Sequence, residues 1–132
     1  MASIRREIRV DAPAEKVWDA VRDVGSIHKR LVPGFVADCR LEGDDARIVR
    51  FGNGLVIKEI IVDLDEASRR LCWSAKSERL MHHNASLQIF ADGPGTKAVW
   101  IADLLPNEAA PAIGAMIDHG MGAMKKTLER AD

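Results

Sequence analysis

The segment that decides the fold is NEAAPAIGAMIDHGMGAMKKTLER, residues 107–130, which has the pattern of one long helix. Pro111 suits its first turn, and the cationic Lys125 and Lys126 suit the negative C-terminal end of the helix dipole. One stripe at helical spacing carries apolar and small residues. Its members are Ile113, Met116, Ile117, Gly120, Met124 and Leu128.

The composition of this stripe allows two interpretations. A glycine inside a helix costs about 1 kcal/mol relative to alanine, so the missing side chain at Gly120 should serve a purpose. Methionine is flexible and recurs at surfaces that accept varied shapes. The stripe is therefore either the wall of a cavity or an ordinary core face that tolerates a glycine.

The segments before this helix have the alternation of strands. Six of them lie at 35–41, 47–51, 55–64, 71–77, 85–91 and 97–105, separated by short connections that favour antiparallel hairpins. A further strand at 3–10 precedes a helix that begins near Pro13 and a second short helix at 27–31. One face of such a sheet needs cover, and only 107–130 is long enough to supply it. We therefore predict an α+β fold in which a curved, seven-stranded antiparallel sheet wraps around the C-terminal helix, with the two short helices closing one end.

The composition is that of an ordinary globular chain, and it argues against several classes of function. The 132 residues carry a formal net charge of −1, without a basic stripe of the kind that binds nucleic acid phosphates. No apolar run is long enough for a membrane span or a signal peptide. Cys39 and Cys72 form no closely spaced pair, so we expect free thiols in a reducing cytoplasm. We predict one cytoplasmic domain, residues 1–132, that does not bind nucleic acid and does not insert into membranes.

Five short motifs carry a family resemblance in their order and spacing. They are APAEKVW at 12–18, EIIVDLD at 59–65, RRLCW at 69–73, GTKAVW at 95–100 and MKKTLE at 124–129. With them the chain resembles the START-like, or SRPBCC, superfamily, in its polyketide cyclase/dehydrase and lipid-transport branch. The resemblance implies a helix-grip fold whose cavity commonly holds a small apolar molecule. Because members range from lipid carriers to hormone receptors and cyclases, the fold alone does not select an activity.

Two loops are similar to the gate and latch of the plant abscisic-acid receptors in that superfamily. Gly52, Asn53 and Gly54 occupy the place of the gate, and Arg79 and Leu80 occupy the place of the latch. The gate lacks the proline of the receptors, and their cavity lysine would fall near position 37, which is alanine here. Neither the same gating nor the same carboxylate-anchored hormone is expected.

Glu59 is the most informative polar position before the final helix. It lies in LVIKEIIV, residues 55–62, where Lys58 and Glu59 are the only charged residues. Successive strand residues face opposite sides, so one of the two should point inward, and by resemblance it is Glu59. There it would serve as a hydrogen-bond anchor or proton donor. The alternative is a surface glutamate paired with a cation on a neighbouring strand.

His83 shares its parity with Ala85 and Leu87, which predicts that it faces the mouth of the cavity. It could hydrogen-bond a ligand or titrate near neutral pH. The alternative is a solvated histidine at the start of a strand. No nucleophile motif, phosphate-binding loop or metal-ligand spacing appears, so neither a cofactor nor a metal is predicted.

One tryptophan and two arginines are further candidates for the same interior. Trp73 alternates with Leu71 and Ala75 and should face the interior, and the resemblance implies that it lines the cavity. Arg47 and Arg50 fall on opposite faces of one strand, so at most one of them points inward, and the pattern does not decide which. The full set of predicted ligand-binding residues is Val56, Glu59, Trp73, His83, Ala85, Leu87, Ile113, Met116, Ile117, Gly120 and Met124.

The leading hypothesis is a protein that binds a small, mainly apolar ligand, such as a lipid, aromatic or polyketide-like molecule, with Glu59 and His83 as orienting contacts. One alternative is a polyketide cyclase/dehydrase-type enzyme in which Glu59 and His83 are the acid and base. A second alternative is a protein-interaction module with a closed core. The sequence leaves a homodimer open.

Overall fold

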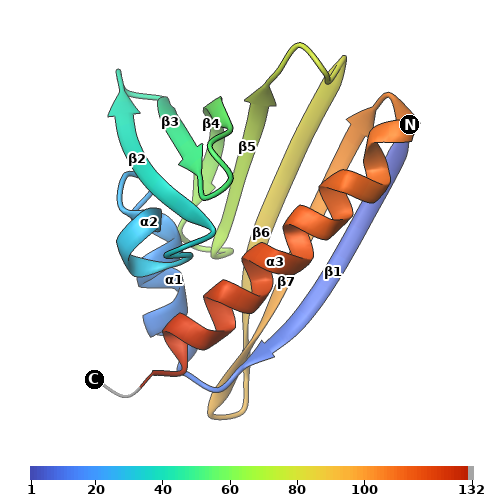
Figure 1. Ribbon diagram of the computed structural model, residues 1–132. Helices are drawn as coiled ribbons and strands as arrows, with labels where there is room; N and C mark the ends of the chain where they lie inside the picture. The colour runs from blue at the N-terminus through green and yellow to red at the C-terminus, as the bar shows by residue number, and fades with distance from the viewer. Residues whose placement is uncertain (131–132) are drawn as a thin grey trace.

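A seven-stranded antiparallel sheet forms the body of the structure, a computed structural model that describes residues 1–130 (Figure 1). In chain order the strands are β1 (Ala2–Val10), β2 (Val36–Glu42), β3 (Ala46–Phe51), β4 (Val56–Asp65), β5 (Arg70–Lys76), β6 (His82–Asp92) and β7 (Gly95–Leu105). Their order across the sheet is β1-β7-β6-β5-β4-β3-β2, so the last strand returns beside the first. The predicted fold class is confirmed. The last two residues of the predicted domain, 131 and 132, lie outside the described residues.

The helices cover the concave face of the sheet and one of its ends (Figure 1). α1 (Ala14–Arg22) and α2 (Ile27–Arg30) follow β1, and α3 (Ala110–Leu128) runs diagonally across the sheet. The predicted single helix at 107–130 begins instead with a 3₁₀ turn, η1 (Asn107–Ala109), a common start for an α-helix. No helix within residues 1–130 is both long and apolar enough to span a membrane.

Two β-bulges interrupt the ladders and bend the sheet. The register shifts between Val36 and Asp38 on β2, and between Ile61 and Asp63 on β4. A bulge bends its strand and increases the local twist, which helps the sheet to curve around α3. The bulge on β4 also changes the alternation of that strand, so that Ile61 before it and Leu64 after it both pack against the core.

Polar contacts hold both helical layers to the sheet. The Trp18 indole N–H on α1 donates to Glu66 Oε1 at 2.7 Å, and Arg22 pairs with the same carboxylate at 2.7 Å. At the far end of α3, Glu129 accepts the backbone N–H of Asp11 at 2.7 Å. The Lys125 ammonium donates to the carbonyl of Arg9, also at 2.7 Å. The C-terminal end of α3 is thereby tied to β1, while its N-terminal half borders the site described next.

Candidate ligand-binding site between the sheet and the C-terminal helix

A pocket of about 560 Å³ lies between the concave face of the sheet and α3. Most of its walls are apolar side chains from the strands, from α2 and from α3. The polar and charged residues that border it are Arg47, Glu59, Lys76, Ser77, Glu78, Arg79 and His83. Ligand sites in proteins share this design of apolar walls with a few polar groups.

The structure brings together most of the residues that the sequence singled out. Those that border the pocket are Val56, Glu59, Trp73, His83, Leu87, Ile113, Met116, Ile117 and Met124. Ala85 lies behind the wall, buried between its strand neighbours Trp73 and Ala102. Gly120 is also buried and does not border the pocket.

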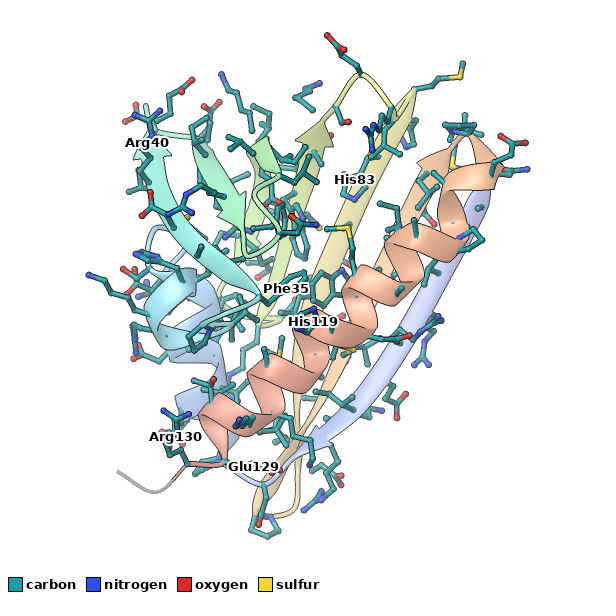
Figure 2. The ribbon with its side chains drawn as sticks, in the orientation of Figure 1. Phe35, Arg40, His83, His119, Glu129 and Arg130 are labelled. Carbon is teal, nitrogen blue, oxygen red and sulfur yellow. The ribbon has the colours of Figure 1, made fainter. Side chains whose placement is uncertain are left out.

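Gly120 makes room for aromatic rings instead of for a ligand. A Cβ at this position would lie 3.0 Å from Phe35 Cε2 and 3.2 Å from Trp100 Cζ3. Both aromatic rings border the pocket, and Phe35 also contacts the His119 ring edge to face at 5.2 Å (Figure 2). The missing side chain therefore lets α3 approach the aromatic wall, which corrects the expectation that Gly120 is itself a wall.

Val56 stands on the rim of the pocket, not within it. The residue is 56% exposed, and its register partner on β3 is the outward-facing Arg50. Strand side chains alternate, so Glu59 shares its face with Ile57 and not with Val56. Applied strictly, the period of two predicts Ile57 for the inner wall, and Ile57 does border the pocket.

Glu59 faces inward and is paired with Arg47. The two residues lie directly opposite each other on β4 and β3, and Arg47 Nε donates to Glu59 Oε1 at 2.8 Å. Both are buried, with 4% of Arg47 and 7% of Glu59 exposed. Arg47 also donates to the carbonyl of Val24 at 3.2 Å, and its guanidinium lies 5.8 Å from the Trp73 ring centroid. Glu59 thus combines features of both interpretations of the sequence: it faces the pocket, and it is paired with a cation on a neighbouring strand.

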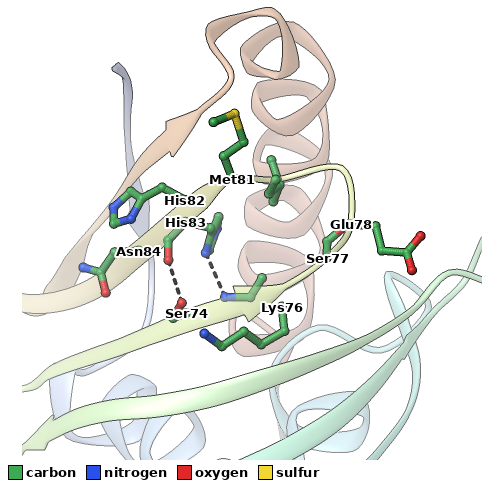
Figure 3. A pocket seen from close by; sticks show the side chains of 10 residues that line it. Ser74, Lys76, Ser77, Glu78, Met81, His82, His83 and Asn84 are labelled. Atoms are coloured by element: carbon green, nitrogen blue, oxygen red, sulfur yellow. Dashed lines mark hydrogen bonds between the residues drawn. The ribbon is translucent and has the colours of Figure 1, made fainter.

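His83 projects from β6 into the space between the sheet and α3 (Figure 2). Its Nδ1 accepts the backbone N–H of Ala75 on β5 at 3.0 Å, and its carbonyl accepts the Ser74 hydroxyl at 2.7 Å (Figure 3). Burial lowers the pKa of His83, and the nearby Glu59 charge opposes that effect only in part. The histidine is therefore neutral near pH 7.

Several residues of the pocket wall were not predicted from the sequence, because they come from segments that are distant along the chain. Phe35 comes from the loop before β2 and packs edge to face on Phe51, with ring centroids 5.3 Å apart. Trp100 on β7 packs in the same manner on Trp73, at 5.6 Å. Only the curvature of the sheet brings these rings from β5, β7 and the loop before β2 to one pocket.

The gate and latch segments take different places. Gly52, Asn53 and Gly54 do not border the pocket, although Phe51 and Leu55 on either side of them do. Gly52 donates to the carbonyl of Phe35 at 2.9 Å, and a Cβ on it would lie 2.4 Å from the carbonyl oxygen of Gly34. Arg79 and Leu80 of the latch border the mouth.

A second, more polar pocket of about 580 Å³ adjoins the first where the loop at 77–81 joins β5 to β6 (Figure 3). The residues common to both are Ala75, Lys76, Ser77, Glu78, Leu80 and His83. His83 thus lies at the boundary between the apolar interior and the polar mouth. Within residues 1–130 no group of three His, Cys, Asp or Glu side chains could hold a metal ion.

Comparisons with known proteins add a family and several solved structures. The model of the family described as polyketide cyclase/dehydrase and lipid transport matches residues 1–129. A solution structure from Thermobifida fusca is 28% identical, with a TM-score of 0.79 over 98% of this chain and 91% of that one. No curated protein matches the sequence.

Two further solved structures share the fold at lower identity. A START superfamily protein from Mycobacterium smegmatis is 16% identical, with a TM-score of 0.72 over 96% of this chain and 94% of that one. A truncated norcoclaurine synthase from Thalictrum flavum is also 16% identical, with a TM-score of 0.74 over 99% and 95% of the two chains. At such identities the likeness concerns the fold alone.

Proposed function

Since the chain belongs to the polyketide cyclase/dehydrase and lipid-transport family, we propose that it binds a small, mainly apolar molecule in the pocket between the sheet and α3. The observation that carries this proposal is the combination of apolar walls with one inward row of polar groups. Trp73, Trp100 and Met116 supply apolar contact area, while Glu59 and His83 supply directional contacts. The volume of about 560 Å³ is in the range of pockets that hold small molecules.

Two features favour binding over the other functions considered. The Glu59 carboxylate is already engaged by Arg47, which suits an anchor better than an acid that must exchange its proton during turnover. A protein-interaction module would have a closed core, whereas this core opens to the mouth beside the loop at 77–81. We therefore propose a carrier or receptor of a small molecule.

The proposal is tested by filling the pocket from one strand. Ala75 borders the pocket between Glu59 and His83, so Ala75→Leu should occupy ligand space. We expect the variant to lose at least about tenfold in affinity for naphthalene, because a displaced ligand forfeits much of its apolar burial. Equilibrium dialysis measures the affinity, and native mass spectrometry of the purified protein identifies any molecule that co-purifies.

Ala91→Leu is the matched control, because Ala91 is an exposed alanine on β6 away from the pocket. It should bind naphthalene as the unmodified protein does. Equal affinity of all three proteins, or no binding of any apolar probe, would contradict the proposal. Conversion of a co-purified molecule to a product would favour the enzymatic alternative.

A further inference from the structure

Glu59 and His83, two of the polar residues that border the pocket, have opposite hydrogen-bonding characters. His83 Nδ1 accepts a backbone N–H, so in the neutral imidazole the proton is on Nε2. The lowered pKa of His83, caused by its burial, agrees with a neutral ring. His83 therefore offers the pocket one N–H donor.

Glu59 offers an acceptor. Both of its contacts with Arg47, from Nε and from Nη2 at 2.8 Å each, reach Oε1. No hydrogen bond within residues 1–130 reaches Oε2. In the same part of the chain, the one side-chain nitrogen or oxygen that is sealed from solvent without a partner is His28 Nδ1. Glu59 Oε2 and His83 Nε2 also accept or donate no hydrogen bond within residues 1–130, yet neither is sealed from solvent, so both atoms are accessible. The pocket is the space that both residues border.

The donor and the acceptor flank one small residue. Glu59 pairs with Ala75 on β5, and the Ala75 N–H bonds His83 on β6, so the three residues form one row across the concave face. Neighbouring strands lie about 4.8 Å apart, which separates the Glu59 and His83 backbones by roughly 10 Å. If one ligand oxygen makes a hydrogen bond to each residue, Glu59 Oε2 and His83 Nε2 must lie about 5–6 Å apart. The two long side chains can come this close by leaning toward each other over the Ala75 methyl group.

We propose that the ligand is a neutral molecule with a hydroxyl group, which donates its proton to Glu59 Oε2 and accepts a hydrogen bond from His83 Nε2–H. The inference rests on the binding function proposed above and specifies the polar end of the ligand. A hydroxyl is the smallest group that both donates and accepts through one oxygen. Phenols and alcohols on an apolar skeleton are the matching chemical class.

A ketone or a carboxylate does not satisfy both members of the pair. A ketone accepts from His83 and leaves Glu59 Oε2 unpaired, and an unpaired buried acceptor is costly. A carboxylate would bring a negative charge to Glu59 in a row where Arg47 already balances the existing charge. The remaining cations that border the pocket, Lys76 and Arg79, lie at its mouth on the β5–β6 side.

The test compares naphthalene, naphthol and naphthoate, which share one ring system. Equilibrium dialysis at pH 7 should give naphthol an affinity about tenfold above naphthalene, the ratio that one net hydrogen bond of ordinary strength provides. Naphthoate should bind more weakly than naphthol. In Glu59→Gln an amide donor can replace the carboxylate acceptor, so the preference for naphthol should disappear and naphthoate should gain affinity.

Glu42→Gln is the matched control, because Glu42 is likewise paired across strands, with Lys58 at 2.7 Å, on the exposed side of the sheet. It should retain the preference for naphthol. If Glu59→Gln does not fold, His83→Phe provides the second variant, and it should lose the same preference. Equal affinities of naphthol and naphthalene overturn the inference but leave the binding function standing. Tightest binding of naphthoate also overturns the inference, and binding of none of the three probes overturns both proposals.

Discussion

Arg47 organises the polar row of the pocket. Its guanidinium contacts the Glu59 carboxylate, the carbonyl of Val24 and the face of Trp73, although only 4% of the residue is exposed. Removing a charged pair from water costs several kcal/mol, which good geometry and further hydrogen bonds must offset. The pair therefore sets the orientation of the Glu59 carboxylate more than it adds to stability.

Removing one partner of this pair should be costly. Arg47→Met leaves the Glu59 carboxylate buried without its cation, and we expect the free energy of unfolding to fall by about 3–5 kcal/mol. The double variant Arg47→Met/Glu59→Leu should recover much of that loss. Urea denaturation measures each value. Arg50→Met, at an exposed site on the same strand, should change stability little, and an equally small loss for Arg47→Met would contradict a buried pair.

His83 should make the stability depend on pH. Its pKa is lower in the folded protein than the ordinary value of about 6.5, so the unfolded chain binds its proton more readily. The free energy of unfolding should therefore decrease as the pH falls below about 6.5 toward the folded-state pKa, with no loss from this group above that range. The charged or titratable groups around it are Glu59, Arg47, Lys76, Glu78, Arg79 and His82.

The measurement is a series of urea titrations between pH 5 and pH 8, a span chosen around the ordinary histidine pKa of about 6.5. His83→Gln should flatten the acid side of the profile. His82→Gln should retain it, because His82 is exposed. Identical slopes for the unmodified protein and His83→Gln would exclude the buried, neutral histidine.

At the scale of the element, α3 uses its glycines in different ways. Gly120 is buried against the Phe35 and Trp100 rings, whereas a Cβ at Gly122 would meet no atom within 4 Å. The same residue type therefore provides close packing at one position and only backbone freedom at the other. The helical stripe in the sequence contains Gly120 but cannot identify its neighbours.

Alanine and leucine substitutions separate the two roles. Gly122→Ala should raise the free energy of unfolding by about 1 kcal/mol, the difference in helix propensity. Gly120→Ala should gain less, since its Cβ would lie 3.0 Å from Phe35. Gly120→Leu should lose about 1–3 kcal/mol through overpacking. Thermal and urea unfolding measure all three, and equal gains at both glycines would disprove close packing at Gly120.

At the scale of the whole molecule, the order of elements was predictable. Period-two alternation marked the strands, turn residues marked the hairpins, and the last helix had an apolar stripe long enough to cover the sheet. The errors concerned the boundaries of elements. For example, β6 begins at His82, whereas the sequence pattern predicted a start at residue 85. There His83 and Ser74 make side-chain hydrogen bonds between β5 and β6, which composition does not reveal.

The candidate site was predictable only in part. Trp73, His83 and Met116 border the pocket, because parity and helical spacing are local properties that the sequence records. Glu59 also borders it, but parity alone left the choice between Lys58 and Glu59 open, and only the family resemblance favoured Glu59. Val56 borders the pocket only at its rim, because its parity differs from that of Glu59. The inward choice of Arg47 over Arg50 depends on which face of β3 the sheet turns toward α3.

The sequence by itself determined the elements, their order and the antiparallel sheet beneath the final helix, since these follow from local periodicity and turn chemistry. Only the tertiary structure decided the pairing of Arg47 with Glu59, the packing of Phe35 on Gly120 and the hydrogen bond that orients His83. These contacts join residues on different elements, and their partners are set by register, bulges and sheet curvature. The physical reason is that a side chain's partner depends on how separate elements pack, which no local pattern encodes.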